Sequence, residues 1–527
     1  MNTTSPVNPW PRTYSYAGFS TLRRLALLAL LLWLQGCASV PLDYPKDASQ
    51  ALTDTDTTYL ARESKLWRDD QIDQNGFYPL TEGKDAFGAR LVLMDEAEKS
   101  IDAQYFLMKP DKAGLVFTDE LLEAAGRGVR VRLLLDDIFT TVDDHYFSFL
   151  DAHPNIEVRL FNPISRKGLF ALNYVGHFSR ANRRMHNKSF IVDNQVAIVG
   201  GRNIAEEYFQ LETSGEFIDF DMFLAGPIVR QVSSSFDLYW NNALAMPMEA
   251  IARNLDEDEI NEAWEEVRKE MFLAGNTVYG ESINTPLLKQ FSRDEIAPYF
   301  ANARVIVDSP EKLQLEISEK YQVVANELTQ AMSQARQEII LFTPYFIPGK
   351  NGIEFLRTLR EKGIRIVVIT NSLASNNHTA VHSAYSTYRK RLLEMGVELW
   401  EARADAVTDY RDKESGDWKP LTLHTKGILI DREKVFVGSL NLDPRSIDIN
   451  TEMGILIDSP EMGALMVQEG IEDIPRMAYR LQLNEQGKIR WHATIDDEEI
   501  VETREPLTSG WRRFSAWFQK ILPESQL

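Results

Sequence analysis

A set of chemically active residues occurs twice in this chain at identical spacing, and this repeat constrains the fold more than any other feature. RRMHNKSFIVDNQVAIVGGRN (183–203) and LHTKGILIDREKVFVGSLN (423–441) both read His-x-Lys, four residues, Asp, six residues, Gly-x-x-Asn. The matching residues are His186, Lys188, Asp193 and Asn203 in the first copy, and His424, Lys426, Asp431 and Asn441 in the second. Such a repeat predicts two copies of one structural unit.

The duplication extends upstream of the motif. SIDAQYFLM (100–108) parallels EIILFTPYFIP (338–348), and LLEAAGRGVRVRLLLDD (121–137) parallels FLRTLREKGIRIVVITN (355–371). The second pair shows helical periodicity, then a basic residue with Gly as a helix stop, then an apolar strand. This order predicts an α/β fold of two similar domains, 76–250 and 301–475, each a mixed sheet flanked by helices. We expect a pseudo-twofold relation between them and a shared active site.

The remaining segments are predicted from composition. The acidic stretch 251–300 is typical of a helical insert, and 37–75 is predicted to be a linker. The tail 476–527 is expected to pack on the body or on a membrane. Its segment WRRFSAWFQKILPE (511–524) is amphipathic, which favours core packing and leaves an interfacial membrane helix as the alternative.

The N-terminal segment TLRRLALLALLLWLQGCAS (21–39) has the pattern of a secretory signal. Two arginines precede the apolar run Leu25–Leu34, which is too short to span a bilayer comfortably, and small residues follow. Cys37 is the only cysteine, so no intramolecular disulfide can form. An uncleaved N-terminal anchor is the alternative to a signal peptide at 1–36. Both place the body of the protein outside the cytoplasm.

The junction Gly36-Cys37-Ala38-Ser39 also resembles the lipobox of bacterial lipoproteins. This resemblance implies that the Cys37 thiol is lipidated and becomes the first residue of the mature chain. Because Ala38 replaces the Asp that retains such proteins in the inner membrane, it implies the periplasmic face of the outer membrane.

Charge limits the classes of partner. The chain has 57 Lys and Arg against 78 Asp and Glu, a net charge of −21, so nucleic acid is a poor partner at long range. A local cluster formed by Arg180, Arg183 and Arg184 stands next to His186. A solvated face is the ordinary interpretation of such a cluster, and a contact with a headgroup phosphate is the alternative that its position favours.

The spacing of each motif predicts a phosphate site. In an extended strand His186 and Lys188 point to one face, and the Gly200-Gly201 pair lets the chain approach closely and return Asn203 toward them. Lys and Asn would bind phosphate oxygens while His attacks phosphorus. With two half-sites, one His forms a phosphohistidine and the other acts as general acid and base, without a metal or cofactor. The arginine cluster leads us to expect His186 as the nucleophile.

Each histidine also needs a carboxylate to fix its tautomer. The second half offers Glu452 for His424, and the first half offers Asp219 for His186, with Asp221 as the alternative.

Other candidate side chains have simpler interpretations. Asp193 and Asp431 follow a strand at a turn, where a structural role is favoured over acid–base work. His378 and His382 have possible metal spacing on a helix, but no further ligand cluster accompanies them, so helix packing is favoured.

Both motif copies match the signature of the phospholipase D superfamily at every fixed position, and the resemblance covers residues 76–475. GFYPLTEGKDAFGARLVLMDEAEKSIDAQYF, DFDMFLAGPIV and VGSLNLDPRSIDINTE look like the cardiolipin synthase C type of bacterial enzyme. One departure is Gly201 where the second copy has Ser439. The resemblance implies catalytic roles for the eight motif residues with Asp219 and Glu452, and substrate contacts from Gly201, Ser439 and Arg184.

The expected function is therefore phosphatidyl transfer between phospholipids at a membrane surface, producing cardiolipin. Phosphatidylglycerol and phosphatidylethanolamine are the candidate substrates, and the need for a small partner protein is left open. The first alternative is a phospholipase D that uses water as acceptor and releases phosphatidic acid. A periplasmic phosphodiesterase or nuclease is a third hypothesis, disfavoured by the net charge.

Overall fold

The computed structural model describes residues 40–524, apart from 69–72, 139–143, 167–172, 175–176, 211–215, most of 252–296, 407–419, 473 and 496–497. Cys37 and the predicted signal peptide lie outside the described residues, as does most of the predicted helical insert. Within the described ranges, no helix has the length and apolar character needed to cross a bilayer.

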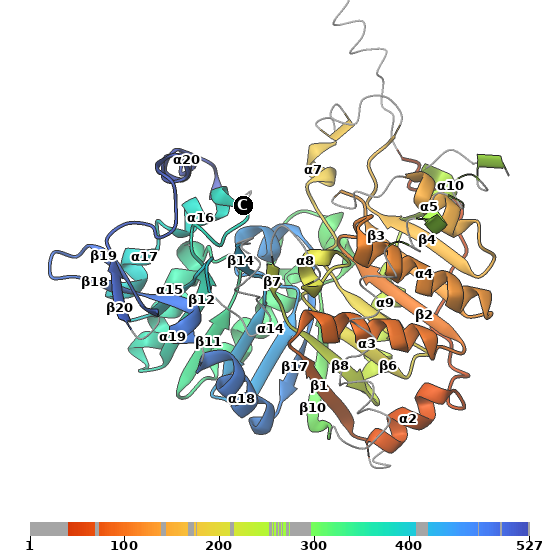
Figure 1. Ribbon diagram of the computed structural model, residues 1–527, viewed down its shortest axis with the longest axis horizontal. Helices are drawn as coiled ribbons and strands as arrows, with labels where there is room; N and C mark the ends of the chain where they lie inside the picture. The colour runs from red at the N-terminus through yellow and green to blue at the C-terminus, as the bar shows by residue number, and fades with distance from the viewer. Residues whose placement is uncertain are drawn as a thin grey trace, which may run out of the picture.

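The first half of the chain forms a mixed sheet (Figure 1). Its strands run from the outer edge inward in the order β9 (Ala245–Pro247), β4 (Ile156–Phe161), β3 (Arg130–Asp136), β2 (Ser100–Tyr105), β5 (Ser189–Val192), β6 (Val196–Gly200), β8 (Asp221–Ala225) and β1 (Asn75–Leu80). Strands β2, β3 and β4 are parallel, and the other pairings are antiparallel.

The second half repeats this order. From the junction outward it contains β10 (Tyr299–Val307), β17 (Met453–Asp458), β16 (Lys434–Gly438), β15 (Gly427–Ile430), β11 (Glu338–Phe342), β12 (Arg365–Asn371) and β13 (Glu398–Ala402). Because β1 pairs with β10, the described strands of both halves join edge to edge in one sheet of 18 strands. The identical order on both sides of that junction confirms the predicted pair of similar α/β domains.

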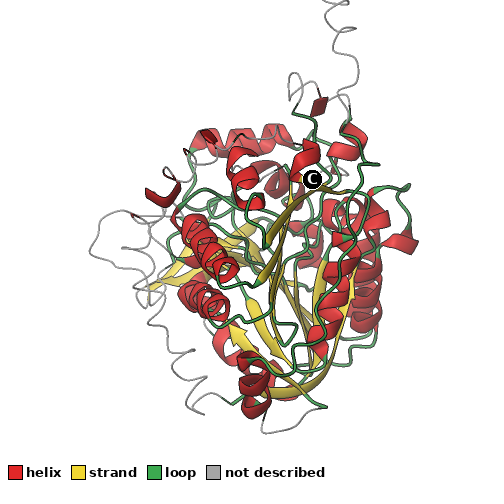
Figure 2. Ribbon diagram, turned by 90° about the vertical axis from the view of Figure 1, so that its right-hand side faces the viewer, coloured by secondary structure: helices red, strands yellow, loops and turns green. Residues whose placement is uncertain are grey.

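Alternate residues of the strands enter different cores, as the period of two requires. In β3, Leu133 and Leu135 face the helices α3 (Gly83–Asp95) and α4 (Lys112–Gly126), whereas Leu134 enters a core that contains residues of both domains. In the second domain α14 (Val323–Ser333) and α15 (Gly349–Glu361) take the place of α3 and α4. Helix α9 (Ile228–Trp240) packs in the shared core, and the helices cover the sheet as seen in Figure 2.

The predicted helix stops occur at equivalent places. Gly128 (φ 97°) follows α4 and Gly363 (φ 85°) follows α15, and each lets the chain reverse into the next parallel strand. A side chain is strained at such φ values, so glycine is the residue expected there.

Both flanking segments pack on the body of the protein. In the predicted linker, Ser49 and Lys46 form hydrogen bonds with Asn241 and with the carbonyl oxygens of Asn242 and Ala245, and α2 (Tyr59–Trp67) follows. In the tail, β18 (Ala478–Leu483) pairs with β13, and β19 (Ile489–Ile495) and β20 (Glu498–Glu502) extend the sheet further. The final helix α20 (Gly510–Gln519) exposes its aromatic residues, so the expectation that it packs in the core is wrong.

The two motif aspartates hold equivalent turns. Asp193 and Asn194 both have φ 52° in the turn between β5 and β6, as a type I′ hairpin turn requires. The buried Asp193 carboxylate accepts hydrogen bonds from the backbone N–H groups of Glu98, Lys99 and Ser100 at 3.1, 2.7 and 2.9 Å. Asp431 accepts three equivalent bonds at the start of β11. Each aspartate therefore fixes the start of the first parallel strand of its domain.

Replacing Asp193 tests this role. Asp193→Ala removes an acceptor from three backbone N–H groups, and we expect a loss of stability of about 2–3 kcal/mol, seen as a lower thermal unfolding midpoint. Asp193→Asn retains an oxygen for the Lys99 and Ser100 bonds and should fall between the alanine variant and the native chain. An unchanged midpoint in Asp193→Ala would contradict the assignment.

Candidate functional site

The two His-x-Lys segments are positioned by the ends of parallel strands. His186 and Lys188 lie in irregular backbone just before β5, and His424 and Lys426 lie just before β15, so neither pair is inside a regular strand as expected. Asp136, the last residue of β3, accepts a hydrogen bond from Met185 N at 2.9 Å. The sequence analysis missed this positioning role, although Asp136 is the first polar residue after the apolar run of LLLDD (133–137).

Asn371 positions the His-x-Lys segment of the second domain in the same way. It is the last residue of β12, and its side chain bonds both the N–H and the carbonyl oxygen of Leu423, at 2.9 and 2.8 Å. Asp136 and Asn371 occupy equivalent positions in the repeat, and this equivalence is the sequence signal that could have identified them.

Each His-x-Lys segment then pairs with backbone of the other domain. His186 N donates to the carbonyl oxygen of Thr451 at 2.9 Å, and Met185 and Thr451 form a parallel bridge. His424 N donates to the carbonyl oxygen of Ile218 at 2.7 Å, because β14 (Leu421–Leu423) runs parallel to β7 (Glu216–Ile218). The residue after each accepting carbonyl is a carboxylate, and it is thereby carried to the histidine of the opposite domain.

The carboxylates consequently pair across the domains. His186 Nδ1 lies 2.9 and 3.1 Å from the two oxygens of Glu452, and His424 Nδ1 lies 2.6 Å from Asp219 Oδ2. The prediction that each carboxylate serves the histidine of its own half is wrong, since sequence order carries no information about which domain a loop faces. Asp221, the alternative, instead forms an ion pair with Arg90 at 2.8 Å.

Electrostatics hold these pairs as neutral histidine and ionised carboxylate. Burial, followed by the effect of Lys426, lowers the pKa of His424 to about 3, and burial also lowers the pKa of His186 against the opposing effect of Glu452. Burial alone would raise the pKa of Asp219 and Glu452, but the neighbouring lysines and the hydrogen bonds with the two histidines outweigh it and leave both pKa values below the ordinary one. With Nδ1–H directed at a carboxylate, each histidine keeps Nε2 unprotonated, as a nucleophile or base requires.

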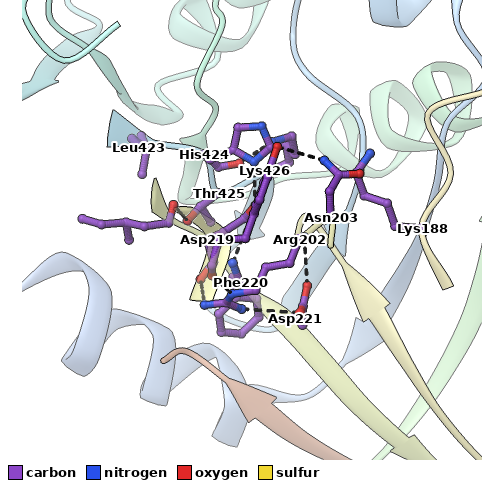
Figure 3. A network of polar contacts seen from close by, with 12 residues as sticks. Lys188, Arg202, Asn203, Asp219, Phe220, Asp221, Leu423, His424, Thr425 and Lys426 are labelled. Carbon is purple, nitrogen blue, oxygen red and sulfur yellow. Dashed lines mark hydrogen bonds and ion pairs between the residues drawn. The ribbon is translucent and has the colours of Figure 1, made fainter. Parts of the chain in front are cut away.

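Both lysines are buried, each two residues after a histidine. Lys426 is drawn with His424 and Asp219 in Figure 3. Lys188 Nζ donates to the carbonyl oxygen of His186 at 2.6 Å, and Lys426 Nζ donates to that of His424. Burial lowers the pKa of Lys188 to about 7 and that of Lys426 to about 8, and each lysine also lowers the pKa of the other domain's histidine. An ammonium group has three donors, so each lysine retains donors for an anionic ligand.

The two motif asparagines are in different states. Asn203 donates to the Tyr208 hydroxyl at 2.9 Å and accepts from Leu107 N at 3.2 Å, so its amide is occupied. Asn441 is buried, and among the described side chains its Oδ1 is one of the buried atoms with no hydrogen-bond partner. Asn441 Oδ1 is therefore an acceptor that a substrate hydroxyl could use, whereas a phosphate oxygen could not.

The difference between the two motif copies, Gly201 in the first and Ser439 in the second, has a steric cause. A Cβ at Gly201 would lie 2.1 Å from Asp219 Oδ1, so no side chain fits while Asp219 reaches His424. In the second half the longer Glu452 leaves room for Ser439, whose hydroxyl donates to its carboxylate. Gly201 therefore leaves room for Asp219, and Ser439 holds Glu452 by a hydrogen bond. These contacts with carboxylates differ from the predicted contacts with a substrate.

Three further predicted site residues are bonded to other groups of the protein. Arg184 is buried and pairs with Asp136 at 3.2 Å, so its guanidinium neutralises a carboxylate of its own domain, in contrast to the predicted phosphate contact. Asp193 and Asp431 stand beyond the four-residue strands that follow each His-x-Lys segment, roughly 13 Å along the chain direction. Their bonds to strand N–H groups exclude them from the reacting centre and favour the structural role.

The other two histidines considered as metal ligands, His378 and His382, have partners within the protein. His382 Nε2 lies 2.8 Å from Arg389 Nη2, and His378 packs against Tyr345, so both serve in packing. Among the described residues, no group of three or more His, Cys, Asp or Glu is arranged to hold a metal ion.

Comparison with known proteins agrees with this geometry. A family model described as cardiolipin synthase, PLD-like domain, matches residues 91–240 and 328–472, more than half of the chain and one segment in each domain. The chain belongs to the phospholipase D-like family of cardiolipin synthases. It is thus an enzyme of the phospholipase D superfamily, as the repeated motif predicts.

Individual relatives share most of their length with this enzyme. Cardiolipin synthase C of Escherichia coli K12 is 36% identical over 458 residues, which cover 85% of this chain and 95% of the relative. The major cardiolipin synthase of Bacillus subtilis is 26% identical over 406 residues, 76% of this chain and 69% of the relative. A phosphatidylserine synthase from Haemophilus influenzae has a similar fold, with a TM-score of 0.52 at 15% identity over 80% of this chain and 92% of that structure.

The two half-sites of this phospholipase D-like enzyme differ in one ionisable group. The buried Asp443 follows Asn441 by two residues, where the first half has Ala205 after Asn203. Burial raises the pKa of Asp443 to about 7, and Asp443 in turn raises the pKa of Lys426. Sequence reasoning passed over it because it lies outside the repeated pattern.

The depressed lysine pKa values predict pH-dependent anion binding. Sulfate remains a dianion between about pH 6 and about pH 9 and binds best when Lys188 and Lys426 are protonated. As pH rises through about 7 and about 8 the lysines lose their protons and Asp443 becomes ionised, and both changes oppose the anion. We expect sulfate affinity to fall roughly tenfold per pH unit for each proton involved.

Isothermal titration calorimetry in buffers of different ionisation enthalpy measures this directly. Proton uptake on sulfate binding near neutral pH is the expected result, and Lys188→Met should reduce it. A pH-independent affinity with no proton uptake would contradict the assignment.

Proposed function

We propose that this enzyme transfers a phosphatidyl group between phospholipids at a membrane surface through a phosphohistidine, in the manner of a cardiolipin synthase. The observation that carries the proposal is the pair of buried histidines, each oriented by a carboxylate of the opposite domain and each next to a buried lysine. The names of the relatives supply the substrate class, and phosphatidylglycerol and phosphatidylethanolamine are the candidate lipids.

The first step uses one histidine from each half. Nε2 of the nucleophilic histidine attacks phosphorus, and the P–O bond to the leaving headgroup alcohol breaks. The other histidine, protonated in the complex because the bound phosphodiester anion raises its pKa, gives its proton to that oxygen. The two lysines stabilise the negative charge that develops on the phosphoryl oxygens.

The second step reverses these roles. The histidine that lost its proton removes one from the incoming lipid alcohol, whose oxygen attacks phosphorus while the P–N bond breaks. When the incoming group is water, the same intermediate gives phosphatidic acid, which is the hydrolase alternative. The arginine cluster was the argument for His186 as the nucleophile, and the structure removes it, because Arg180, Arg183 and Arg184 bind groups within the protein. His186 remains our prediction, and peptide mapping has to decide between the two histidines.

Product analysis tests the proposal. The purified enzyme on vesicles of phosphatidylglycerol and phosphatidylethanolamine should produce cardiolipin and a free headgroup alcohol, identified by mass spectrometry. His186→Ala and His424→Ala should each reduce turnover by roughly 10²-fold or more, because each removes a nucleophile or an acid–base group. His492→Ala is the matched control, since His492 lies in β19 and should leave turnover unchanged.

Other outcomes distinguish the alternatives. Phosphatidic acid as the main product would replace transfer by hydrolysis, and cleavage of oligonucleotides without action on phospholipids would favour the nuclease hypothesis. Full activity in either histidine variant would mean that the two half-sites do not work together.

We also propose that Cys37 is lipidated and holds the enzyme at the periplasmic face of the outer membrane of a bacterial envelope. The support is the sequence pattern around Cys37. Intact-mass analysis of the membrane-extracted protein should give a chain that begins at Cys37 and carries lipid, and Cys37→Ser should release it. A chain with residues 1–36 attached, or with an unmodified Cys37, would contradict this.

A further inference from the structure

The most unusual surface of the molecule is the outer face of helix α20. Trp511, Phe514, Trp517 and Phe518 are exposed by 76%, 51%, 64% and 56%, and Ile521 just beyond the helix is exposed by 75%. Residues 511, 514, 518 and 521 recur every three or four positions, so they share one helical face. The helix therefore presents an aromatic stripe to its surroundings.

This stripe is concentrated and ordered. Of the 14 large hydrophobic residues exposed in the described part of the chain, seven lie between Leu507 and Leu522. The rings of Trp511, Phe514 and Trp517 contact one another in sequence, with centroids 5.6 and 6.0 Å apart. A contiguous apolar patch of this kind marks an interaction site, whereas single exposed apolar residues are ordinary.

The opposite face of α20 is attached to the second domain. Ala516 is buried, and Arg512 Nη2 donates to the carbonyl oxygen of Asn376 at 2.6 Å. Beyond the helix, Glu524 accepts from the Tyr388 hydroxyl at 2.5 Å, and before it Glu505 pairs with Arg389. The aromatic face is thus held outward on a fixed support.

The charge around the stripe identifies its partner. Residues 506–523 contain Arg512, Arg513 and Lys520 and no Asp or Glu, in a chain whose net charge is −21. Because Arg512 is bonded to Asn376, Arg513 and Lys520 are the cations for lipid phosphates. Together with the exposed tryptophan and phenylalanine rings they suit the interface of an anionic bilayer, where such rings lie at headgroup depth. The length of the helix and the polarity of its inner face fit a position parallel to the membrane surface.

The location of α20 connects it to the catalytic site. Asn376, which holds Arg512, lies next to Ser375, whose carbonyl oxygen accepts from Thr422 Oγ1 at 2.7 Å in the strand that ends just before His424. In Figure 1, α20, α7 (Phe178–Ala181), which exposes Phe178, and α10 (Met248–Ile251) all lie along the upper edge of the molecule, α20 at the left and α10 at the right.

The described chain also begins near this upper edge of the molecule. Tyr44 interacts with Glu249 of α10, and Val40 is only three residues after Cys37. A lipid on Cys37 and the aromatic face of α20 would therefore meet a membrane from the same side.

We propose that α20 lies in the interfacial layer of an anionic phospholipid bilayer, with its aromatic stripe inserted, and thereby turns the catalytic site toward its lipid substrates. This rests on the proposed function in one respect, namely that the substrates are lipids of that bilayer. The insertion itself depends only on the surface of α20.

Because Cys37 is the only cysteine, insertion can be measured at a single chosen position. The full chain with Cys37→Ser and Trp517→Cys is labelled with an environment-sensitive dye and mixed with vesicles of phosphatidylglycerol and phosphatidylcholine. Leu66→Cys is the matched control, because Leu66 is 60% exposed on α2, at the opposite end of the molecule in Figure 1. We expect a blue shift and higher intensity at position 517, none at 66, and a weaker response to phosphatidylcholine alone.

Two outcomes would overturn the proposal. One is an unchanged dye at position 517 in the presence of anionic vesicles, or an equal change at 66. The other is a shift that appears without vesicles as protein concentration rises, since it would mean that a second copy of the chain covers the stripe.

Activity separates this proposal from the proposed function. The variant Trp511→Ser/Phe514→Ser/Trp517→Ser changes only exposed side chains, and should lose at least tenfold of its activity on vesicles while keeping its activity on monomeric short-chain phospholipids. Leu66→Ser/Leu238→Ser is the control and should behave like the native enzyme in both assays. Equal activity of the aromatic variant and the control on vesicles would overturn the proposal. A dye shift in an enzyme that transfers no phosphatidyl group to any lipid would refute the proposed function and leave the insertion standing.

Discussion

The hydrogen bond between each buried histidine and a carboxylate of the opposite domain is the interaction on which the rest of the site depends. His186 bonds Glu452 and His424 bonds Asp219, so neither domain alone contains a complete histidine–carboxylate pair. Each carboxylate fixes the Nδ1–H tautomer and leaves Nε2 for chemistry. Because Thr451 and Ile218 also bond the histidine backbones, the pairing is part of the domain interface itself.

The charges of the site explain why it suits a phosphodiester. Two carboxylates and two lysines are buried together, and burial lowers the lysine pKa values to about 7 and about 8. The negative charge of a phosphodiester favours the ammonium form of both lysines. The net charge of −21 over the whole chain thus coexists with a small anion site, and the segment 506–523, with three cations and no carboxylate, is a second local exception.

Much of this could be predicted from the sequence, since the repeat fixes spacing and strand order. The repeat predicted the paired α/β domains, the two histidine–lysine pairs and both carboxylates. It did not predict the crossing of the carboxylates, because spacing along the chain gives no information about which domain a loop faces. The burial of Arg184 against Asp136 and the exposure of Trp511 and Trp517 depend on tertiary packing, which composition and periodicity do not specify.

The number of covalent adducts formed by one chain tests the account most directly. Enzyme quenched during turnover of phosphorus-labelled phospholipid, under conditions that preserve P–N bonds, is digested and its labelled peptides are mapped. One shared site predicts at most one phosphoryl group per chain, on a single histidine, which we expect to be His186. Labelling of His186 and His424 in the same chain, approaching two groups per chain, would mean two independent sites and would contradict the central claim.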